Sequence, residues 1–321
     1  MSNRMKSKPG ATTAVVDADG LDRRGLLKCM AWAGTAMLWT VSAGVPRSIL
    51  LEDAEAATSA EGLTFAQISD THIGFKQPAN PNTAATMTEA VDRIGRLSPQ
   101  PAFLIHTGDI THLSKPDQFD TAAEIIKRAN KEVHYVPGEH DWIDGGLGFK
   151  ERYGKGTKGD GWYSFDAGGV HFIALINVVN FKAGSLTSLG QEQLAWIKDD
   201  VSGLSASTPI VVFTHIPLWA VYPAWGWGTQ DSAEALGSIK RFGSVTVLNG
   251  HIHQVLQKVE GNVNFHTAMS TAYPQPAPGT ASGPGPLKVP AEKLRSVLGV
   301  REVNYVQNTQ PLATVDTPLM A

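Results

Sequence analysis

Three short apolar runs alternate with two segments of helical periodicity, and this rhythm restricts the fold more than any other feature of the chain. The runs cover residues 63–69, 103–107 and 133–136. Between them, apolar residues recur at spacings of three and four in 82–97 and 119–129. Asn82 can cap the first of these helices. A β-α-β-α-β order makes the strands parallel in one sheet, so we expect an α/β fold.

The later part of the chain adds antiparallel strands, so the sheets should be mixed. The predicted strands are 162–165 and 170–176 in one hairpin, 209–213 and 244–248 as buried strands, and 255–259 with 263–267 in a second hairpin. Ser188 and Gln191 have the spacing of a capping box, which predicts a helix with its apolar face at 194, 197 and 201.

The C-terminal part is weakly patterned. Half of the residues from 273 to 290 are Pro or Gly, which indicates irregular chain, and 302–306 predicts one edge strand. We therefore divide the chain into 1–56, a segment outside the fold, 57–272, one α/β domain, and 273–321, a Pro/Gly-rich segment and tail packed on that domain. A chain of 321 residues can bury the core that such a domain needs.

The N-terminal segment has the features of an export signal. Arg23 and Arg24 precede an uncharged run over 29–45, and the string 22–28 resembles the twin-arginine signal. The run is short for a membrane span, and Ala54-Glu55-Ala56 fits a cleavage site. The resemblance implies passage through the export machinery to a periplasmic or secreted location, with no stable membrane span after cleavage. The alternative is membrane anchoring through an uncleaved N-terminus.

Charge and cysteine usage exclude several kinds of site. The formal net charge is −3, which argues against a broad nucleic-acid surface because such surfaces need clustered basic residues. Cys29 is the single cysteine, so neither an intramolecular disulfide nor a thiolate-built zinc site can form. The ten histidines leave nitrogen and oxygen ligands for a metal.

Metal-type side chains are concentrated just past the ends of the predicted strands. They are Asp70 and His72, then Asp109, then Glu139, His140 and Asp141, then His215, and finally His251 and His253. Ligands in open α/β sheets collect at the carboxyl ends of the strands, so these segments should converge. A shared carboxylate reduces the repulsion between two nearby cations, and the set suits Fe, Mn, Zn or Co. The sequence therefore predicts a centre of two divalent or trivalent transition-metal ions.

Five ordered blocks carry a family resemblance. They are Asp70-Thr-His72, Gly108-Asp109, Gly138-Glu139-His140-Asp141, His215 and Gly250-His251-Ile-His253. This pattern resembles the signature of the calcineurin-like metallophosphoesterases over about residues 63–272. The resemblance implies a four-layer α-β-β-α sandwich with mixed sheets. It also implies hydrolysis of a small phosphate mono- or diester by a hydroxide that bridges two metal ions.

The same resemblance assigns a role to each residue. One metal would be held by Asp70, His72 and His253 and the other by Glu139, His215 and His251, with Asp109 between them. His140 would lie beside the phosphate, and Asp141 would orient it or only cap a turn. His112, three residues after Asp109, is either an extra ligand, a group supporting the ligands, or an ordinary loop residue.

Glu139 departs from the family pattern, which usually has a neutral Asn at this position. Its negative charge should bind the second cation more tightly, weaken that ion as a Lewis acid and repel a phosphate oxygen. This departure keeps a second hypothesis open: a metal-binding sensor or binding module with little turnover.

Aromatic residues crowd the segment after His215. Trp219, Tyr222, Trp225 and Trp227 either line the cleft and contact the substrate or pack the loop onto the domain. The remaining histidines, at 106, 134, 171 and 266, lie within predicted strands, and we interpret them as structural.

Overall fold

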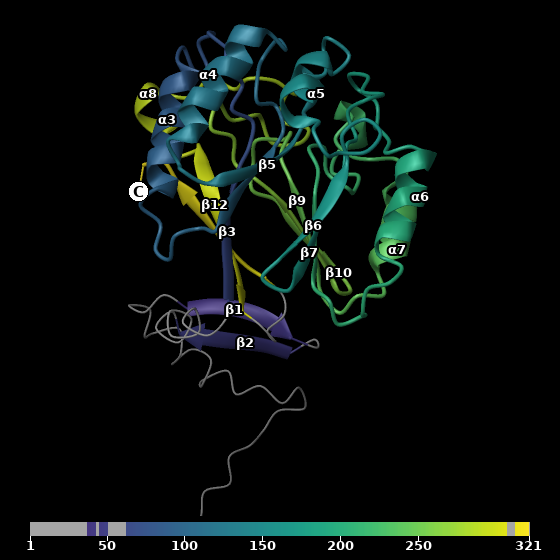
Figure 1. Cartoon of the computed structure of the whole chain (residues 1–321). Helices are drawn as coiled ribbons and strands as arrows, with labels where there is room; N and C mark the ends of the chain where they lie inside the picture. Colours follow the sequence, from purple (N-terminus) through teal and green to yellow (C-terminus); the bar gives the residue numbers. More distant parts are fainter. Residues whose placement is uncertain (1–36, 43–44, 51–61, 307–311, 321) are drawn as a thin grey trace, which may run out of the picture.

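The computed structural model describes residues 37–42, 45–50, 62–306 and 312–320, and two facing β-sheets form its centre (Figure 1). One sheet consists of β3 (Gly62–Ile68), β4 (Phe103–Thr107), β5 (Glu132–Val136), β12 (Gly299–Val306) and β13 (Ala313–Pro318). The other consists of β6 (Tyr163–Ala167), β7 (Val170–Ala174), β8 (Ile210–Phe213), β9 (Val245–Asn249), β10 (Gln257–Glu260) and β11 (Val263–Thr267).

Both sheets are mixed, as the sequence predicts. The five-stranded sheet has the order β13-β12-β3-β4-β5, with β3, β4 and β5 parallel and β12 antiparallel to β3. The six-stranded sheet has the order β10-β11-β9-β8-β7-β6, in which the four central strands are parallel and the two outer ones antiparallel.

Helices cover the outer face of each sheet. Figure 1 shows α3 (Thr83–Ile94), α4 (Pro116–Lys127) and α8 (Ala291–Leu294) on one side and α6 (Gln191–Asp200) and α7 (Ser232–Ile239) on the other, with α5 (Leu147–Tyr153) above the sheets. Phe65, Phe103 and Phe172 are buried between the sheets, where edge-to-face ring contacts join them. The expected four-layer α-β-β-α sandwich is confirmed.

One predicted helix start is confirmed and another is wrong. Asn82 caps α3, because its side chain accepts from the backbone N–H of Ala85 at 3.1 Å. The capping box at Ser188 does not form. Instead, α6 has Gly190 as its N-cap, and the carboxylate of Asp231 accepts from the backbone N–H groups of Leu189 and Gly190. Asp231 directly precedes α7, and its charged carboxylate makes strong hydrogen bonds with these donors just before α6.

The C-terminal tail contributes more than the single edge strand expected at 302–306. That strand is β12, and it lies inside the sheet between β3 and β13. The expectation of an edge strand was wrong because β13 pairs with the side of β12 that faces away from β3. Residues 299–306 and 313–318 therefore complete the sheet that carries β3.

Part of the N-terminal segment is described. β1 (Met37–Ser42) and β2 (Val45–Leu50) pair antiparallel in a separate two-stranded sheet. The twin arginines and the expected cleavage site at 54–56 lie outside the described residues. Among the helices of the described ranges, none combines the length and the apolar character needed to cross a bilayer.

Candidate metal centre

The seven predicted metal ligands follow the carboxyl ends of five strands and meet in one place. Asp70 and His72 follow β3, Asp109 follows β4, Glu139 follows β5, His215 follows β8, and His251 and His253 follow β9. Their ligand atoms form two groups, within each of which the atoms lie no more than 4.8 Å apart. Glu139 is partly exposed, and the other six side chains are buried.

The backbone at five of these residues is left-handed. The φ angles are +53° at Asp70, +40° at His72, +52° at Asp109, +69° at His251 and +54° at His253. This conformation costs an L residue roughly 1–2 kcal/mol, so surrounding contacts must hold it. The backbone N–H of Asp70 donates to the backbone carbonyl of Gly108, and the backbone N–H of His72 donates to the backbone carbonyl of Asp109. These turns bring both side chains of Asp-x-His to the same centre.

The first group of ligand atoms comes from Asp70, His72, Asp109 and His253. Nε2 of His72 lies 3.3 Å from Nε2 of His253 and 3.3 Å from Oδ2 of Asp109. Nε2 of His253 lies 3.2 Å from Oδ1 of Asp70. Ligands of one cation with bonds of about 2.0–2.1 Å lie at roughly such separations from each other.

The second group comes from Glu139, His215 and His251. The Glu139 carboxylate lies 2.9 Å from Nε2 of His215 and 3.1 Å from Nδ1 of His251. Oδ2 of Asp109 also lies 3.5 Å from Nε2 of His215. One oxygen of Asp109 thus faces both groups, which is the position of a bridging ligand.

Backbone carbonyls orient two of the imidazole rings. Nδ1 of His215 donates to the carbonyl of Thr107 at 2.7 Å, and Nδ1 of His253 donates to the carbonyl of Tyr273 at 2.6 Å. Each bond fixes the proton on Nδ1, so Nε2 faces the centre with a free lone pair. Such support is typical of metal-ligating histidines.

Unpartnered polar atoms at the centre fit metal cations. Among the described residues, these three buried atoms have no hydrogen-bond partner: Nε2 of His215, Nδ1 of His251 and Oε2 of Glu139. Burial raises the pKa of Glu139, but the nearby His251 and His215 together lower it by more. The pKa of Glu139 is therefore well below its usual value. An ionised carboxylate facing buried nitrogen lone pairs suits transition-metal ions.

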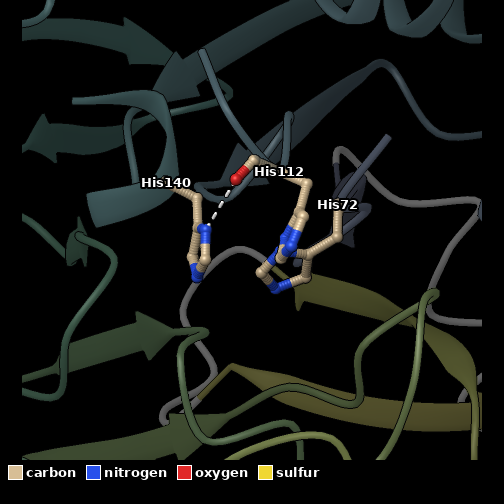
Figure 2. Close-up of side chains that lie close together, drawn as sticks. All are labelled: His72, His112 and His140. Atoms are coloured by element: carbon tan, nitrogen blue, oxygen red, sulfur yellow. Dashed lines mark hydrogen bonds between the residues drawn. The ribbon is translucent and has the colours of Figure 1, made fainter. Parts of the chain in front are cut away.

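Figure 2 shows His140 next to His112, whose backbone carbonyl faces the His140 ring, with His72 nearby. The backbone N–H of His140 donates to Oδ1 of Asp109 at 3.0 Å, and its Nδ1 donates to the carbonyl of His112 at 2.8 Å. The two imidazole rings stack with centroids 4.8 Å apart. His112 therefore holds the ring that the sequence predicts to be catalytic, and it does so partly through its backbone.

Asp141 caps a turn rather than orienting His140, so of its two predicted roles the turn cap is confirmed. Its buried carboxylate accepts from the backbone N–H groups of Ile110, Thr111 and Gly138 at 2.8–3.0 Å. Burial and the charge of Asp109 raise the pKa of Asp141 to about 7, and the three N–H donors oppose this shift. Asp141 therefore joins the loops after β4 and β5, while the carbonyl of His112 occupies Nδ1 of His140.

Two of the four predicted substrate contacts are buried. Trp227 is fully buried and Trp225 nearly so, and both pack against Ile252, which lies between His251 and His253. These two residues form a plug that packs the loop onto the domain, so the expectation that they line the cleft is wrong. Trp219 packs against Phe265 and is partly exposed, as is Tyr222. Substrate contact stays a prediction for Trp219 and Tyr222.

Three of the four histidines within strands have a polar partner or a ring contact in the described part of the chain. His106 is buried beside the hydroxyl of Thr71, and burial lowers its pKa to about 3. His171 pairs with Asp166 and Asp200. The ring of His134 stacks on Phe165 with centroids 3.8 Å apart, and His266 lies in β11.

Sequence reasoning missed the segment that follows β11. Ser270 donates its hydroxyl to the carbonyl of Asp70, and Gln275 donates its side-chain amide to the carbonyl of His251. The hydroxyl of Tyr273 lies 3.2 Å from Nε2 of His72. The one available signal was position: this segment follows a strand adjacent to β9, whose end carries two predicted ligands.

Comparisons with known proteins agree with this geometry. The sequence model of the calcineurin-like phosphoesterase family matches residues 63–255. A 3',5'-cyclic-nucleotide phosphodiesterase from Nostoc sp. is 26% identical over 223 residues, covering 66% of this chain and 79% of that protein. The bovine serine/threonine-protein phosphatase CPPED1 is 29% identical over 142 residues, which cover 41% of this chain and 45% of that protein.

Two solved structures share the fold. A dimetal phosphatase from Danio rerio superimposes with a TM-score of 0.62 at 14% identity, covering 80% of this chain and 96% of that one. A purple acid phosphatase from yellow lupin superimposes with a TM-score of 0.58 at 11% identity, covering 81% of this chain and 52% of that one. At these identities the likeness concerns the fold alone.

Proposed function

The chain belongs to the calcineurin-like phosphoesterase family and is a metal-dependent phosphoric ester hydrolase, and we propose that it hydrolyses phosphate diesters in preference to monoesters at a centre of two transition-metal ions. One observation carries the two-ion part: Asp109 Oδ2 lies between Nε2 of His72 at 3.3 Å and Nε2 of His215 at 3.5 Å. A carboxylate oxygen in that position can serve both ligand groups.

The chain's own residues divide the work at this centre. Asp70, His72 and His253 would hold one ion, Glu139, His215 and His251 would hold the other, and Asp109 would serve both. When bound, two such cations supply Lewis-acid stabilisation of the phosphoryl oxygens and an acidified water for attack on phosphorus. Fe, Mn, Zn and Co all suit this mixture of imidazole and carboxylate donors.

His140 is placed to hold or donate a proton. Its Nδ1 proton points at the carbonyl of His112, so Nε2 is the ring atom left for the substrate. Burial lowers the pKa of His140, but the carboxylates of Asp109 and Glu139 outweigh it and raise the pKa above its usual value. A protonated Nε2 would donate to a phosphoryl or leaving-group oxygen.

Glu139 supports the preference for diesters. A monoester brings about two negative charges to the centre and a diester brings one. The Glu139 carboxylate, only 15% exposed, adds a further negative charge beside His215 and His251. Electrostatic repulsion therefore acts more strongly against the monoester. The Nostoc sp. relative, a named cyclic-nucleotide phosphodiesterase, supports the same preference.

A metal-resolved assay tests the proposal. The purified protein is loaded with Mn, Fe, Zn or Co, its metal content is measured, and bis-p-nitrophenyl phosphate is compared with p-nitrophenyl phosphate. We expect a higher kcat/KM for the diester. The Glu139→Asn variant should shift the ratio toward the monoester on the order of tenfold, because one charge is removed. Glu151→Gln, at an 81% exposed carboxylate, should leave the ratio unchanged.

The outcomes separate two classes of protein. Two bound ions without turnover of either ester, for every metal, would contradict the enzyme and support the metal-binding sensor or binding module. Faster monoester hydrolysis by the parent protein would contradict the diester preference but leave the phosphoesterase intact.

The N-terminal sequence supports export as a further part of the proposal. Arg23, Arg24 and the uncharged run after them would direct the chain through the twin-arginine machinery to a periplasmic or secreted location. We expect a mature N-terminus near residue 57 and retention of the precursor in the cytoplasm when both arginines become Lys. N-terminal sequencing and fractionation measure both. An intact N-terminus in the membrane fraction would instead support an anchored form.

A further inference from the structure

The segment after β11 packs directly against the proposed metal centre. The hydroxyl of Ser270 donates to the carbonyl of Asp70 at 2.8 Å, and the side chain of Gln275 donates to the carbonyl of His251 at 2.7 Å. Residues 268–276 lie beyond the region that the family model matches, which ends at 255. The family match therefore assigns no role to this segment.

Tyr273 is the residue of this segment that reaches the ligand atoms. Its side chain is 4% exposed, and its ring lies against His72 and His253 with centroid distances of 4.9 and 4.8 Å. Its carbonyl accepts from Nδ1 of His253, and its hydroxyl oxygen lies 3.2 Å from Nε2 of His72. Both ends of the residue are thus fixed on ligands of the same ion.

The short distance between the Tyr273 hydroxyl oxygen and Nε2 of His72 suits two ligands of one bound ion. Nε2 of His72 then uses its lone pair for the metal and cannot accept a hydrogen bond from Tyr273. The phenol oxygen is left at 3.2 Å, the same separation that relates the other members of the group, at 3.2–3.3 Å. Two ligands of one cation, each about 2.0–2.1 Å from it, lie at roughly this distance from each other.

We propose that Tyr273 supplies its phenol oxygen as an additional ligand to the ion held by Asp70, His72 and His253. On binding, the O–H bond of the phenol breaks, the proton passes to water, and the phenolate oxygen bonds to the cation. A hard, anionic oxygen donor added to two carboxylates favours a hard trivalent cation, so this ligand selects Fe³⁺ at this position. The proposal rests on the two-ion centre of the proposed function and adds a ligand to it.

Iron loading of the full chain tests the proposal without any assay of turnover. A phenolate bound to Fe³⁺ gives a ligand-to-metal charge-transfer band in the visible range, which carboxylate and imidazole ligands do not give. We expect the Fe³⁺-loaded parent to show this band. Tyr273→Phe should lose it, and its affinity for Fe³⁺ should fall at least ~10–100-fold, as measured by competition with a chelator. The substitution keeps the ring contacts with His72 and His253, so the fold should persist.

Tyr222→Phe is the matched control. Tyr222 lies in the aromatic segment, where its ring contacts Trp225 rather than a predicted ligand, so this variant should keep the band. A parent protein that holds iron without the band, or that does not retain Fe³⁺, overturns the proposal. So does a band that persists in Tyr273→Phe. Absence of ester hydrolysis with the band present would instead count against the proposed function alone.

Discussion

Asp109→Asn is expected to lose bound metal and to lower kcat/KM for a diester on the order of 10³-fold or more. Oδ2 of Asp109 faces Nε2 of both His72 and His215, and its Oδ1 accepts from the backbone N–H of His140. The amide keeps the size of the side chain but removes the charge that offsets repulsion between two cations. Metal analysis and hydrolysis of bis-p-nitrophenyl phosphate on the same sample measure both effects.

His140→Ala provides the contrast to this variant. His140 lies outside the seven predicted ligands, so its removal should lower turnover ~10²–10⁴-fold while both ions stay bound. Asp92→Asn is the matched control for the charge, because Asp92 pairs with Arg128 on the surface and is 41% exposed. An Asp109→Asn protein that retained two ions and the parent rate would refute the placement of the centre.

Arg301→Met should destabilise the protein by about 3–5 kcal/mol, because it leaves a largely buried charge without its partner. Arg301 is fully buried in β12, and its guanidinium donates to both oxygens of Asp316 in β13 at 2.9 Å. It also donates to the side chain of Gln67 at 3.2 Å and to the carbonyl of Thr267 at 2.8 Å. Methionine fills a similar volume and satisfies none of these acceptors. Urea unfolding followed by circular dichroism measures the change in free energy.

The same substitution should also weaken metal binding, because hydrogen bonds continue from Arg301 to a predicted ligand. Gln67 donates to Thr107, Thr107 donates to Ser69, and Ser69 donates to the carboxylate of Asp70. We expect a loss of metal affinity of about 10–100-fold, as for other groups that orient ligands.

Arg295→Met is the control for this prediction. Arg295 also makes a two-fold contact with a carboxylate, that of Glu89, but both side chains are about 40% exposed. Its loss should cost less than about 1 kcal/mol. If the Arg295 and Arg301 variants had equal free energies of unfolding, burial of the Arg301–Asp316 pair would contribute nothing to stability.

The order of chemical groups along the chain was enough to predict the centre. Each predicted ligand stands a few residues after an apolar run, and the structure has a strand at each of those runs. Because parallel strands end at the same edge of a sheet, segments as distant as Asp70 and His253 were expected to meet. Asn82 was predictable for a similar reason, since a cap and its helix are adjacent in sequence.

Side-chain partners from distant parts of the chain could not be read in this way. The carbonyl of His112 orients His140, and Asp141 instead accepts backbone donors from another loop. Asp231, which directly precedes α7, accepts from the backbone N–H groups just before α6, where the sequence predicts a cap by Ser188. In each case the sequence offered a local partner, and a stronger or closer group became available only once two layers had packed.

The sequence by itself determined the alternation of strands and helices, the strand ends that carry ligands, and the chemistry of those ligands, because these properties depend on local spacing and residue type. The tertiary structure alone decided that β12 lies inside a sheet, that Trp227 is buried, and that Tyr273 reaches His72 across 201 positions of sequence. The physical reason is that burial and long-range contacts depend on which surfaces face each other after the sheets pack, and no short pattern in the chain encodes that choice.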